Sequence, residues 1–561
     1  MRKYKLIYIV VGAMIIAGTA CKKQLNVGNP NSPTISGNAN TEAGLYALTQ
    51  GATFINGFVN GDGWLGNSYF SLPWGYSELL ADNVGADAAN QEISVVSVPD
   101  LVTYGAGLTL ANNSPHIGFI RSYNTRANTG AGNNVLYYQW TNMYALNAAC
   151  NTILNTIGSI TFSGDAASRA NTVKAWCYWW KGYAYASIGS QYYSGLIIDN
   201  YNGTSNVYKV KDSIIARSNY YYNLAATTIG AITSTSDYTT VLSQLIPSAF
   251  QVGYGQVPTT AMWLRNINTM LARNIMANKL NPFVNGKVNA TIGKSSTSVM
   301  TAADWNNVLT LTQKGVQQGD NVFTGRASSA NAIFTALGGT VAAMTAKTNT
   351  NATFKITERF IQNYGAGDLR LTTNFNTATR YNNPGFTTRY SLIDCSTGPG
   401  TPTSATTVQL ANLNPGAYQA YIGTSFEENQ LMQAEAQIML GNTNAGLALV
   451  DAVRTYQGAG VPAVAGTGLT QAQAMTQLTS ESRVALVFRG LSFYNARRWG
   501  WIYSVANGGG YYNGTFLTVA GVVYNNATFN YNFLDYWDVP ADESVLNPPG
   551  AGSAATVNPN F

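Results

Sequence analysis

The sequence predicts a mostly α-helical fold, in which helical hairpins form a scaffold and long irregular stretches connect them. Three observations predict it. Apolar side chains recur at three- and four-residue spacing in several segments, which is the period of an amphipathic helix. Some of these segments begin with a capping pattern and end at a glycine. Two further stretches, about 84–135 and 320–420, have little periodicity, so we expect large loop-rich regions there.

Helical spacing occurs in five parts of the chain. These parts are about 41–80, 139–190, 214–280, 301–318 and 425–500. In the second part, small residues such as Gly182 and Ala184 alternate with Tyr183 and Tyr185, so neighbouring helices can approach closely. Antiparallel pairs of this kind build tetratricopeptide-like solenoids, although the literal repeat consensus is absent.

Two helix starts and one helix end can be predicted from single residues. Thr301 with Asp304, and Ser425 with Glu428, have the spacing of a capping box. Gly441 follows the second of these helices and is expected to end it. A partner helix over 444–456 would then complete a hairpin.

Composition favours an extracytoplasmic protein with a neutral polar surface. Charged residues make up 10% of the 561 residues, against about 25% in typical soluble domains. Asn, Thr, Ser, Gly and 35 tyrosines take their place. Such a surface suits a neutral ligand such as a carbohydrate, but it would equally suit an exported protein with no glycan preference. No basic stripe interleaved with aromatic residues occurs, which argues against nucleic-acid binding.

The N-terminus has the pattern of a bacterial lipoprotein leader. A basic start is followed by an apolar run over 6–17, and small residues precede Cys21. We therefore predict a signal peptide over 1–20, acylation of Cys21 and a tether over 21–40. An ordinary signal peptide followed by an incidental cysteine is the alternative. The remainder, 41–561, has no obvious linker and is predicted to be one domain.

Cysteine and histidine content excludes several kinds of chemistry. Cys150, Cys177 and Cys395 follow Cys21, and an odd number gives no disulfide framework. Cys150 and Cys177 fall in predicted helices and are expected to be small buried hydrophobes. The single histidine argues against zinc and Ser-His-Asp sites, so we expect no metal and no cofactor.

Five charges are concentrated in 480–500, within an apolar helical pattern. They are Glu481, Arg483, Arg489, Arg497 and Arg498. A guanidinium group in an apolar face needs a carboxylate or carbonyl partner. We therefore predict that this segment anchors the core of the protein.

This segment resembles the arginine-rich motif near the C-terminus of the SusD/RagB family, the nutrient-binding outer-membrane lipoproteins of Bacteroidetes. The hairpin over 428–458 and the tail over 536–548 resemble the same family. The residues that match in the hairpin are Glu428, Leu431, Ala434, Glu435, Ala436, Gly441, Ala448, Val450, Val453, Arg454 and Gly458. The motifs occur in the family's order from Cys21 almost to Phe561.

The resemblance implies four tetratricopeptide-like hairpins and a loop-rich ligand-binding region. It also implies capture of an oligosaccharide or polysaccharide, and its delivery to a SusC-like TonB-dependent barrel. A peptide ligand, or a structural surface lipoprotein without a ligand, would be alternatives. The protein would be anchored in the outer membrane through Cys21 and would face the cell surface.

The resemblance places the ligand-facing loops within 60–125. The candidate site residues there are Trp64, Trp74, Tyr76, Asn83, Tyr104, Asn112, Arg121 and Tyr123. Sugar C–H faces can lie on the rings, while amide and guanidinium groups bind hydroxyls. The alternative is that these rings belong to the core.

Paired carboxylates could in principle hydrolyse glycosides. The candidates are Glu427 with Glu428, Asp82 with Asp87, and Asp542 with Glu543. Carboxylates in such hairpins are more often bound to core arginines, for which Arg454 and Arg483 are available. We therefore expect no enzymatic activity.

Overall fold

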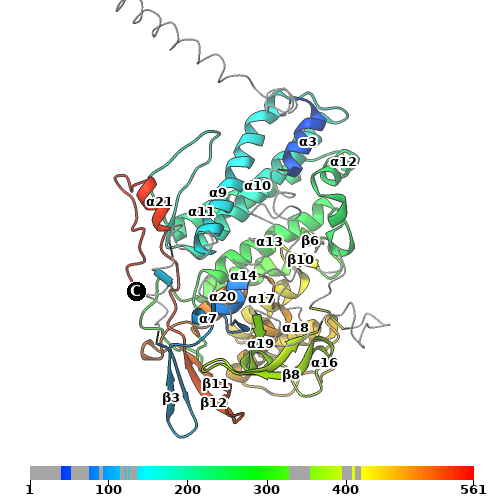
Figure 1. The fold of residues 1–561 in the computed structure, drawn as a ribbon. Helices are drawn as coiled ribbons and strands as arrows, with labels where there is room; N and C mark the ends of the chain where they lie inside the picture. Colours follow the sequence, from blue (N-terminus) through cyan, green and yellow to red (C-terminus); the bar gives the residue numbers. More distant parts are fainter. Residues whose placement is uncertain are drawn as a thin grey trace, which may run out of the picture.

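The computed structural model describes residues 40–51, 75–86, 93–113, 120, 121, 124, 135–326, 354–393, 407–410 and 419–561. Most regular structure in these ranges is helical, which confirms the predicted fold class (Figure 1). The predicted leader and Cys21 lie outside the described residues. Within the described ranges, no helix has both the length and the apolar character needed to cross a membrane.

Three long helices form the upper part of the scaffold in Figure 1. They are α9 (Val135–Thr156), α10 (Ala166–Gln191) and α11 (Lys211–Gly230). Helix α10 packs against both of the others. Helices α3 (Glu42–Gln50) and α12 (Thr235–Leu245) pack at one end, and α13 (Thr260–Ala277) continues the stack from α11.

Glycine allows the close approach of α10 and α11, as the alternation of small and large residues predicted. A Cβ added to Gly182 would lie 2.8 Å from the ring of Tyr222. One added to Gly189 would lie 2.9 Å from Ile215. Asp165 caps the start of α10 by accepting a hydrogen bond from the Ser168 amide at 3.1 Å.

The second half of the scaffold is built from α14 (Ala302–Gln313), α17 (Phe426–Met439), α18 (Thr443–Tyr456), α19 (Gln471–Ala485) and α20 (Ser492–Arg498). Helices α17 and α18 form the predicted hairpin, and Gly441 between them has φ +89°. The capping box of Thr301 and Asp304 is present. Ser425 caps α17, but the Glu428 carboxylate binds Arg273 and Thr424 instead of completing the box.

The stretches predicted to be loop-rich contain short strands. One sheet has the order β1-β7-β9-β8, formed by β1 (Val84–Ala86), β7 (Phe354–Ile356), β8 (Phe375–Tyr381) and β9 (Thr388–Leu392). Residue Val84 pairs with Ile356, so the two stretches belong to one unit. Strands this short show little alternation, and their partners lie far away in the sequence, which is why periodicity did not reveal them.

A second sheet has the order β11-β12-β2-β3. Its strands are β2 (Leu101–Tyr104), β3 (Leu108–Ala111), β11 (Tyr511–Leu517) and β12 (Val523–Asn530). A small pair, β6 (Thr324–Arg326) with β10 (Gln419–Tyr421), lies beside the helices.

The segment predicted as one hairpin over 41–80 contributes to two parts of the fold. Helix α6 (Gly75–Leu80) packs on α20 and β1, whereas α3 packs on α9 and α12.

The arginines of 480–500 anchor the core, as predicted. Arg483 donates to the Asn83 side-chain oxygen at 2.8 and 3.0 Å, and to the carbonyls of Ala81 and Asp82 at 3.1 and 2.9 Å. Arg497 donates to three carbonyl oxygens at 2.6–2.8 Å, and Arg498 binds Glu435. These guanidinium groups join helices to segments that are distant in the sequence.

We predict that Arg483→Lys destabilises the fold by about 3 kcal/mol, because an ammonium group cannot replace a planar fork at a buried site. Urea unfolding followed by tryptophan fluorescence measures the change. The matched control is Arg380→Lys, since Arg380 is exposed and such changes alter stability by about 0.5 kcal/mol or less. Equal stability of both variants would contradict the anchoring role.

Candidate functional site

The second sheet carries no charged residue in its strands or in their connecting turns. Residues 101–111 and 511–530 contain no Asp, Glu, Lys or Arg. We call this unit the uncharged sheet. Its two hairpins extend from the body at the lower end of Figure 1, where β3 is blue and β11 and β12 are orange-red. Because Tyr104 ends β2, the structure places one predicted site residue on this unit.

Tyr104 is half-buried against two other rings. Its ring centroid lies 4.8 Å from that of Phe516 and 5.1 Å from that of Tyr524. Val102 and Phe529 are paired neighbours on the same sheet, and both are buried. One face of the uncharged sheet is therefore an apolar core that holds Tyr104 in position.

The other face of the sheet presents hydroxyl groups. Thr528 pairs with Thr103, which in turn pairs with Thr109, so three threonines lie side by side across three strands. Their side chains point away from Val102 and Phe529, since successive residues alternate between faces. Tyr512 on β11 is 37% exposed. This arrangement supplies neutral hydrogen-bonding groups and an accessible ring.

The tips of the hairpins are apolar and accessible. Leu108 is 55% exposed and Val522 is 50% exposed. The turns depend on glycine, because Gly105, Gly107 and Gly521 have φ of +57°, +94° and +91°. Apolar side chains are therefore accessible at both hairpin tips, beside the polar face of the sheet.

A glutamine joins the edge of the uncharged sheet to the body of the protein. Gln362, at the end of α15 (Glu358–Ile361), accepts a hydrogen bond from the Thr515 amide at 2.5 Å. Its own amide group donates to the Asn513 carbonyl at 3.2 Å. The side chain thus imitates a neighbouring strand along β11 and keeps the sheet in a defined place.

Three other predicted site residues have structural partners. Asn83 is buried and binds Arg483, Glu78 and Ser492. Asn112 donates to the Val98 carbonyl at 3.2 Å. Arg121 binds Asp538 at 2.9 Å and donates to the carbonyls of Asn558 and Phe561, so it holds the C-terminal segment. These side chains are engaged within the protein.

The remaining candidates are not described by the structure. Trp64, Trp74 and Tyr123 lie outside the described residues, as do Asp87 and His116. Tyr76 belongs to α6, but its side chain is not described. Of the eight candidates, Tyr104 is therefore the one that the described part of the chain places on an accessible sheet.

Five residues of the uncharged sheet were not predicted from the sequence. Tyr524 contacts Tyr104 on the apolar face, whereas Thr103, Thr109, Thr528 and the accessible Tyr512 supply polar groups. The absence of charge throughout 511–530 is visible in the sequence and could have indicated a neutral binding surface. The pairing of β12 with β2 could not be predicted, because more than four hundred positions separate the two strands.

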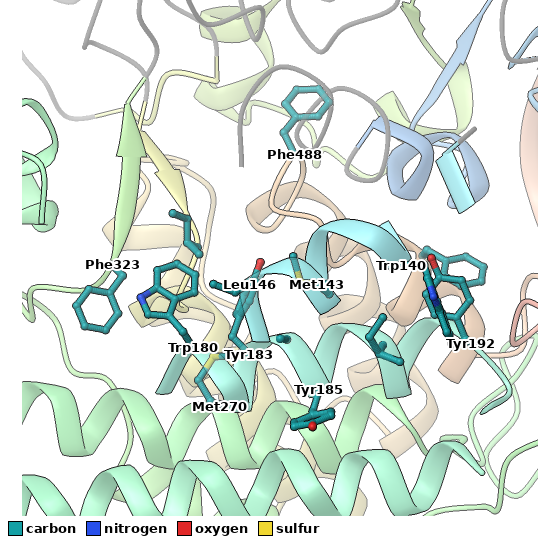
Figure 2. Close-up of a cluster of buried hydrophobic side chains, with 14 of the residues drawn as sticks. Trp140, Met143, Leu146, Trp180, Tyr183, Tyr185, Tyr192, Met270, Phe323 and Phe488 are labelled. Atoms are coloured by element: carbon teal, nitrogen blue, oxygen red, sulfur yellow. The ribbon is translucent and has the colours of Figure 1, made fainter. Parts of the chain in front are cut away.

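A cavity of about 60 Å³ lies between α10, α13 and α20. Its lining includes Gln139, Tyr183, Arg273, Tyr494 and Trp537. Figure 2 shows Tyr183 and Met270, which also line it, among the buried side chains of the core. An ordered water needs about 10–15 Å³, so this cavity has room for a few waters and is too small for an oligosaccharide.

Four carboxylates of the three candidate pairs are bound within the protein. Glu427 binds Arg489 at 2.9 Å, and Glu428 binds Arg273 at 2.5 Å. Asp82 makes two bonds of 2.7 Å to Arg359. The expected partners Arg454 and Arg483 are wrong for these pairs, because Arg454 binds Glu481 at 3.0 Å and Arg483 binds Asn83. Glu543 accepts from the Trp140 indole at 3.2 Å.

Glu78 is a buried carboxyl group at the junction of α6 and α20. It accepts hydrogen bonds from the Asn83 amide at 2.7 Å, the Ser492 hydroxyl at 2.8 Å and the Phe488 amide at 2.9 Å. Phe488 has φ +62°, which is unusual for a residue with a side chain. Burial raises the pKa of Glu78 to about 7, although the three hydrogen bonds oppose this shift.

The two four-stranded sheets together form what we call the β-rich region. The fold therefore defines a class of protein in which a scaffold of helical hairpins carries a β-rich region with a neutral, accessible surface. No family model and no curated protein matches the chain. Solved structures do match. A SusD-like carbohydrate-binding protein from Bacteroides fragilis is 13% identical, with a TM-score of 0.51 over 90% of this chain and 98% of that chain.

Two further solved structures are similar to this chain over most of its length. A SusD homologue from Bacteroides thetaiotaomicron is 12% identical, with a TM-score of 0.51 over 83% of this chain and 91% of that chain. A structure described with xylogluco-oligosaccharide is 13% identical, with a TM-score of 0.53 over 91% and 99% of the two chains. The chain therefore has the SusD-like fold, which confirms the predicted resemblance at the level of the fold.

We predict that the wild-type protein loses stability between pH 5 and pH 8 relative to Glu78→Gln. The folded state keeps a proton up to pH about 7, whereas the unfolded carboxyl group releases it near 4.5. Ionisation therefore favours the unfolded state across this window, by up to about 3 kcal/mol.

Urea midpoints at pH 5 and pH 8 measure this difference. The control is Asp212→Asn, because the Asp212 side chain is 74% exposed, and it should follow the wild type. A Glu78→Gln variant whose midpoint changes with pH as the wild type does would contradict the role of Glu78.

Proposed function

We propose that this protein is an outer-membrane lipoprotein that captures an oligosaccharide or polysaccharide and delivers it to a SusC-like TonB-dependent transporter. The observation that carries the proposal is the uncharged sheet on a SusD-like fold. Proteins of similar fold are described as carbohydrate-binding, and one was solved with xylogluco-oligosaccharide. The leader and Cys21 support anchoring in a membrane.

The chemistry of the uncharged sheet fits a neutral glycan. A sugar offers C–H faces that pack on an aromatic ring and hydroxyl groups that both donate and accept hydrogen bonds. Tyr512 supplies an exposed ring, and Thr103, Thr109 and Thr528 supply hydroxyl groups.

A peptide is the second candidate ligand within the same import system. Peptides carry a charged group at each end, and capture of a chain end is one of the modes of peptide recognition. The strands and turns of the uncharged sheet carry no charged side chain, although the guanidinium group of Arg380 lies beside Gly521 in the β11-β12 turn. The chemistry of this sheet therefore favours the glycan over the peptide.

The partners of three candidate carboxylates favour binding without cleavage. A glycosidase needs two carboxyl groups that face one bond of the substrate. Glu427, Glu428 and Asp82 each bind an arginine instead. We expect the captured glycan to leave the protein intact.

We predict that residues 22–561, in soluble form, bind a neutral oligosaccharide saturably and release no new reducing ends. Calorimetric titration against a panel of neutral oligosaccharides, polysaccharides and peptides measures the binding. A reducing-sugar assay on the same samples measures cleavage. If only peptides bind saturably, the ligand is a peptide and the proposed glycan is wrong. If the glycan is cleaved, the proposed role in capture is wrong.

We predict that Tyr512→Ala weakens glycan binding about tenfold, which corresponds to the loss of one stacking contact of about 1.4 kcal/mol. The matched control is Tyr220→Ala, since Tyr220 is 49% exposed on α11 of the helical scaffold. Tyr104→Ala should also weaken binding, with some loss of stability because its ring packs on Phe516.

Isothermal titration gives the affinities, and circular dichroism verifies that each variant is folded. Unchanged affinity in both Tyr104→Ala and Tyr512→Ala would remove the uncharged sheet from the binding site. A loss in Tyr220→Ala of the same size would show that the effect is not local.

A further inference from the structure

Two cysteines meet in the core of the helical scaffold. Cys150 belongs to α9 and Cys177 to α10, and these helices pack against each other. Both side chains are fully buried. Their positions coincide along the helix pair, because the side chain one turn after Cys177 binds side chains on either side of Cys150. The odd number of cysteines gave no reason to expect a pair, but the fold places two of them in one buried helix contact.

A buried ammonium group lies beside this pair. Lys181 follows Cys177 by one turn of α10 and has no exposed surface. It donates to the Asn147 side-chain oxygen at 2.7 Å and also to that of Asn151, and these two asparagines flank Cys150 on α9. The ammonium group therefore lies in the same buried helix contact as the two cysteines, and Asp199 lies 3.9 Å from it.

The position of Lys181 matters for sulfur chemistry. The thiolate is the form that attacks a disulfide, and a nearby cation favours the thiolate. In the folded protein, however, burial raises the pKa of Cys177 well above its usual range, so the thiol is unreactive there. Reaction is therefore restricted to the stage at which α9 and α10 come together and still admit a reagent.

We propose that Cys150 and Cys177 form a disulfide when the chain folds after export, and that this bond joins α9 to α10. The proposal rests on the export that the proposed function requires. The external oxidant is a disulfide, such as that of a thiol oxidase. One thiolate of the pair attacks it and releases one thiol, and the second thiolate then attacks the mixed disulfide and releases the other. Two electrons pass to the oxidant, which ends as two thiols.

The bond would stabilise the pair α9 and α10, against which α11, α12 and α13 pack. It closes the chain between Cys150 and Cys177, which reduces the freedom of the unfolded state. Because both sulfurs are buried, the bond would resist reductant until the protein unfolds. The redox state would thus record the compartment in which the chain folded.

The test uses residues 22–561 with Cys395→Ser, placed after a cleavable signal peptide for export, so that Cys150 and Cys177 are the remaining thiols. One sample is exported to an oxidising periplasm, and the other is made in a reducing cytoplasm. Each is unfolded in guanidinium with iodoacetamide and weighed by mass spectrometry. We expect no alkylation and a mass lower by two hydrogens in the exported sample, and two alkylated cysteines in the cytoplasmic sample. The control Cys150→Ser in the same background should show one alkylated cysteine in both.

A second measurement separates this proposal from the proposed function. Reduced, unfolded protein is refolded in a glutathione redox buffer, which needs no export. The pairing is supported if a disulfide forms in this experiment and the urea midpoint is higher than that of the double variant Cys150→Ser, Cys177→Ser. If the exported sample is nevertheless reduced, the proposed export is wrong and the pairing still holds. Two free thiols after both experiments would overturn the proposal.

Discussion

The placement of the β-rich region depends on one buried guanidinium group. Arg483 binds the side chain of Asn83 and the carbonyls of Ala81 and Asp82, where the chain leaves α6 and enters β1. Asp82 has φ +57° and is held by Arg359 from the segment after β7. Since β1 pairs with β7, this junction joins the helical scaffold to both stretches that lack helical periodicity. Without Arg483, several buried polar groups would lose their partners together.

Many charged side chains of the described residues are paired inside the protein. Arg370 binds Asp368 and Glu481, and Arg498 binds Glu435, all of them buried. The uncharged sheet shows the opposite pattern, with rings and hydroxyl groups at the surface. A rigid charged interior with a neutral exterior region suits a protein that must hold a neutral ligand without reacting with it.

Local patterns in the sequence predicted much of the scaffold. The helices around 139–190 and 425–500, the turn at Gly441 and the anchoring role of Arg483 are confirmed, because each depends on neighbouring residues or on a charge in an apolar face. Strand pairing escaped prediction, since β2 and β12 are distant in the sequence. Asn83 entered the candidate site because of its position in a loop, but its amide is a partner for Arg483 that the sequence could not reveal.

The most direct test of the account is hydrogen–deuterium exchange of the mature protein, with and without a saturating oligosaccharide chosen from the titration panel. If the uncharged sheet binds the glycan, backbone amides in 101–111 and 511–530 exchange more slowly when the glycan is bound, and exchange in α17 and α18 is unchanged. Protection confined to the helical scaffold, with no change in the uncharged sheet, would contradict the account.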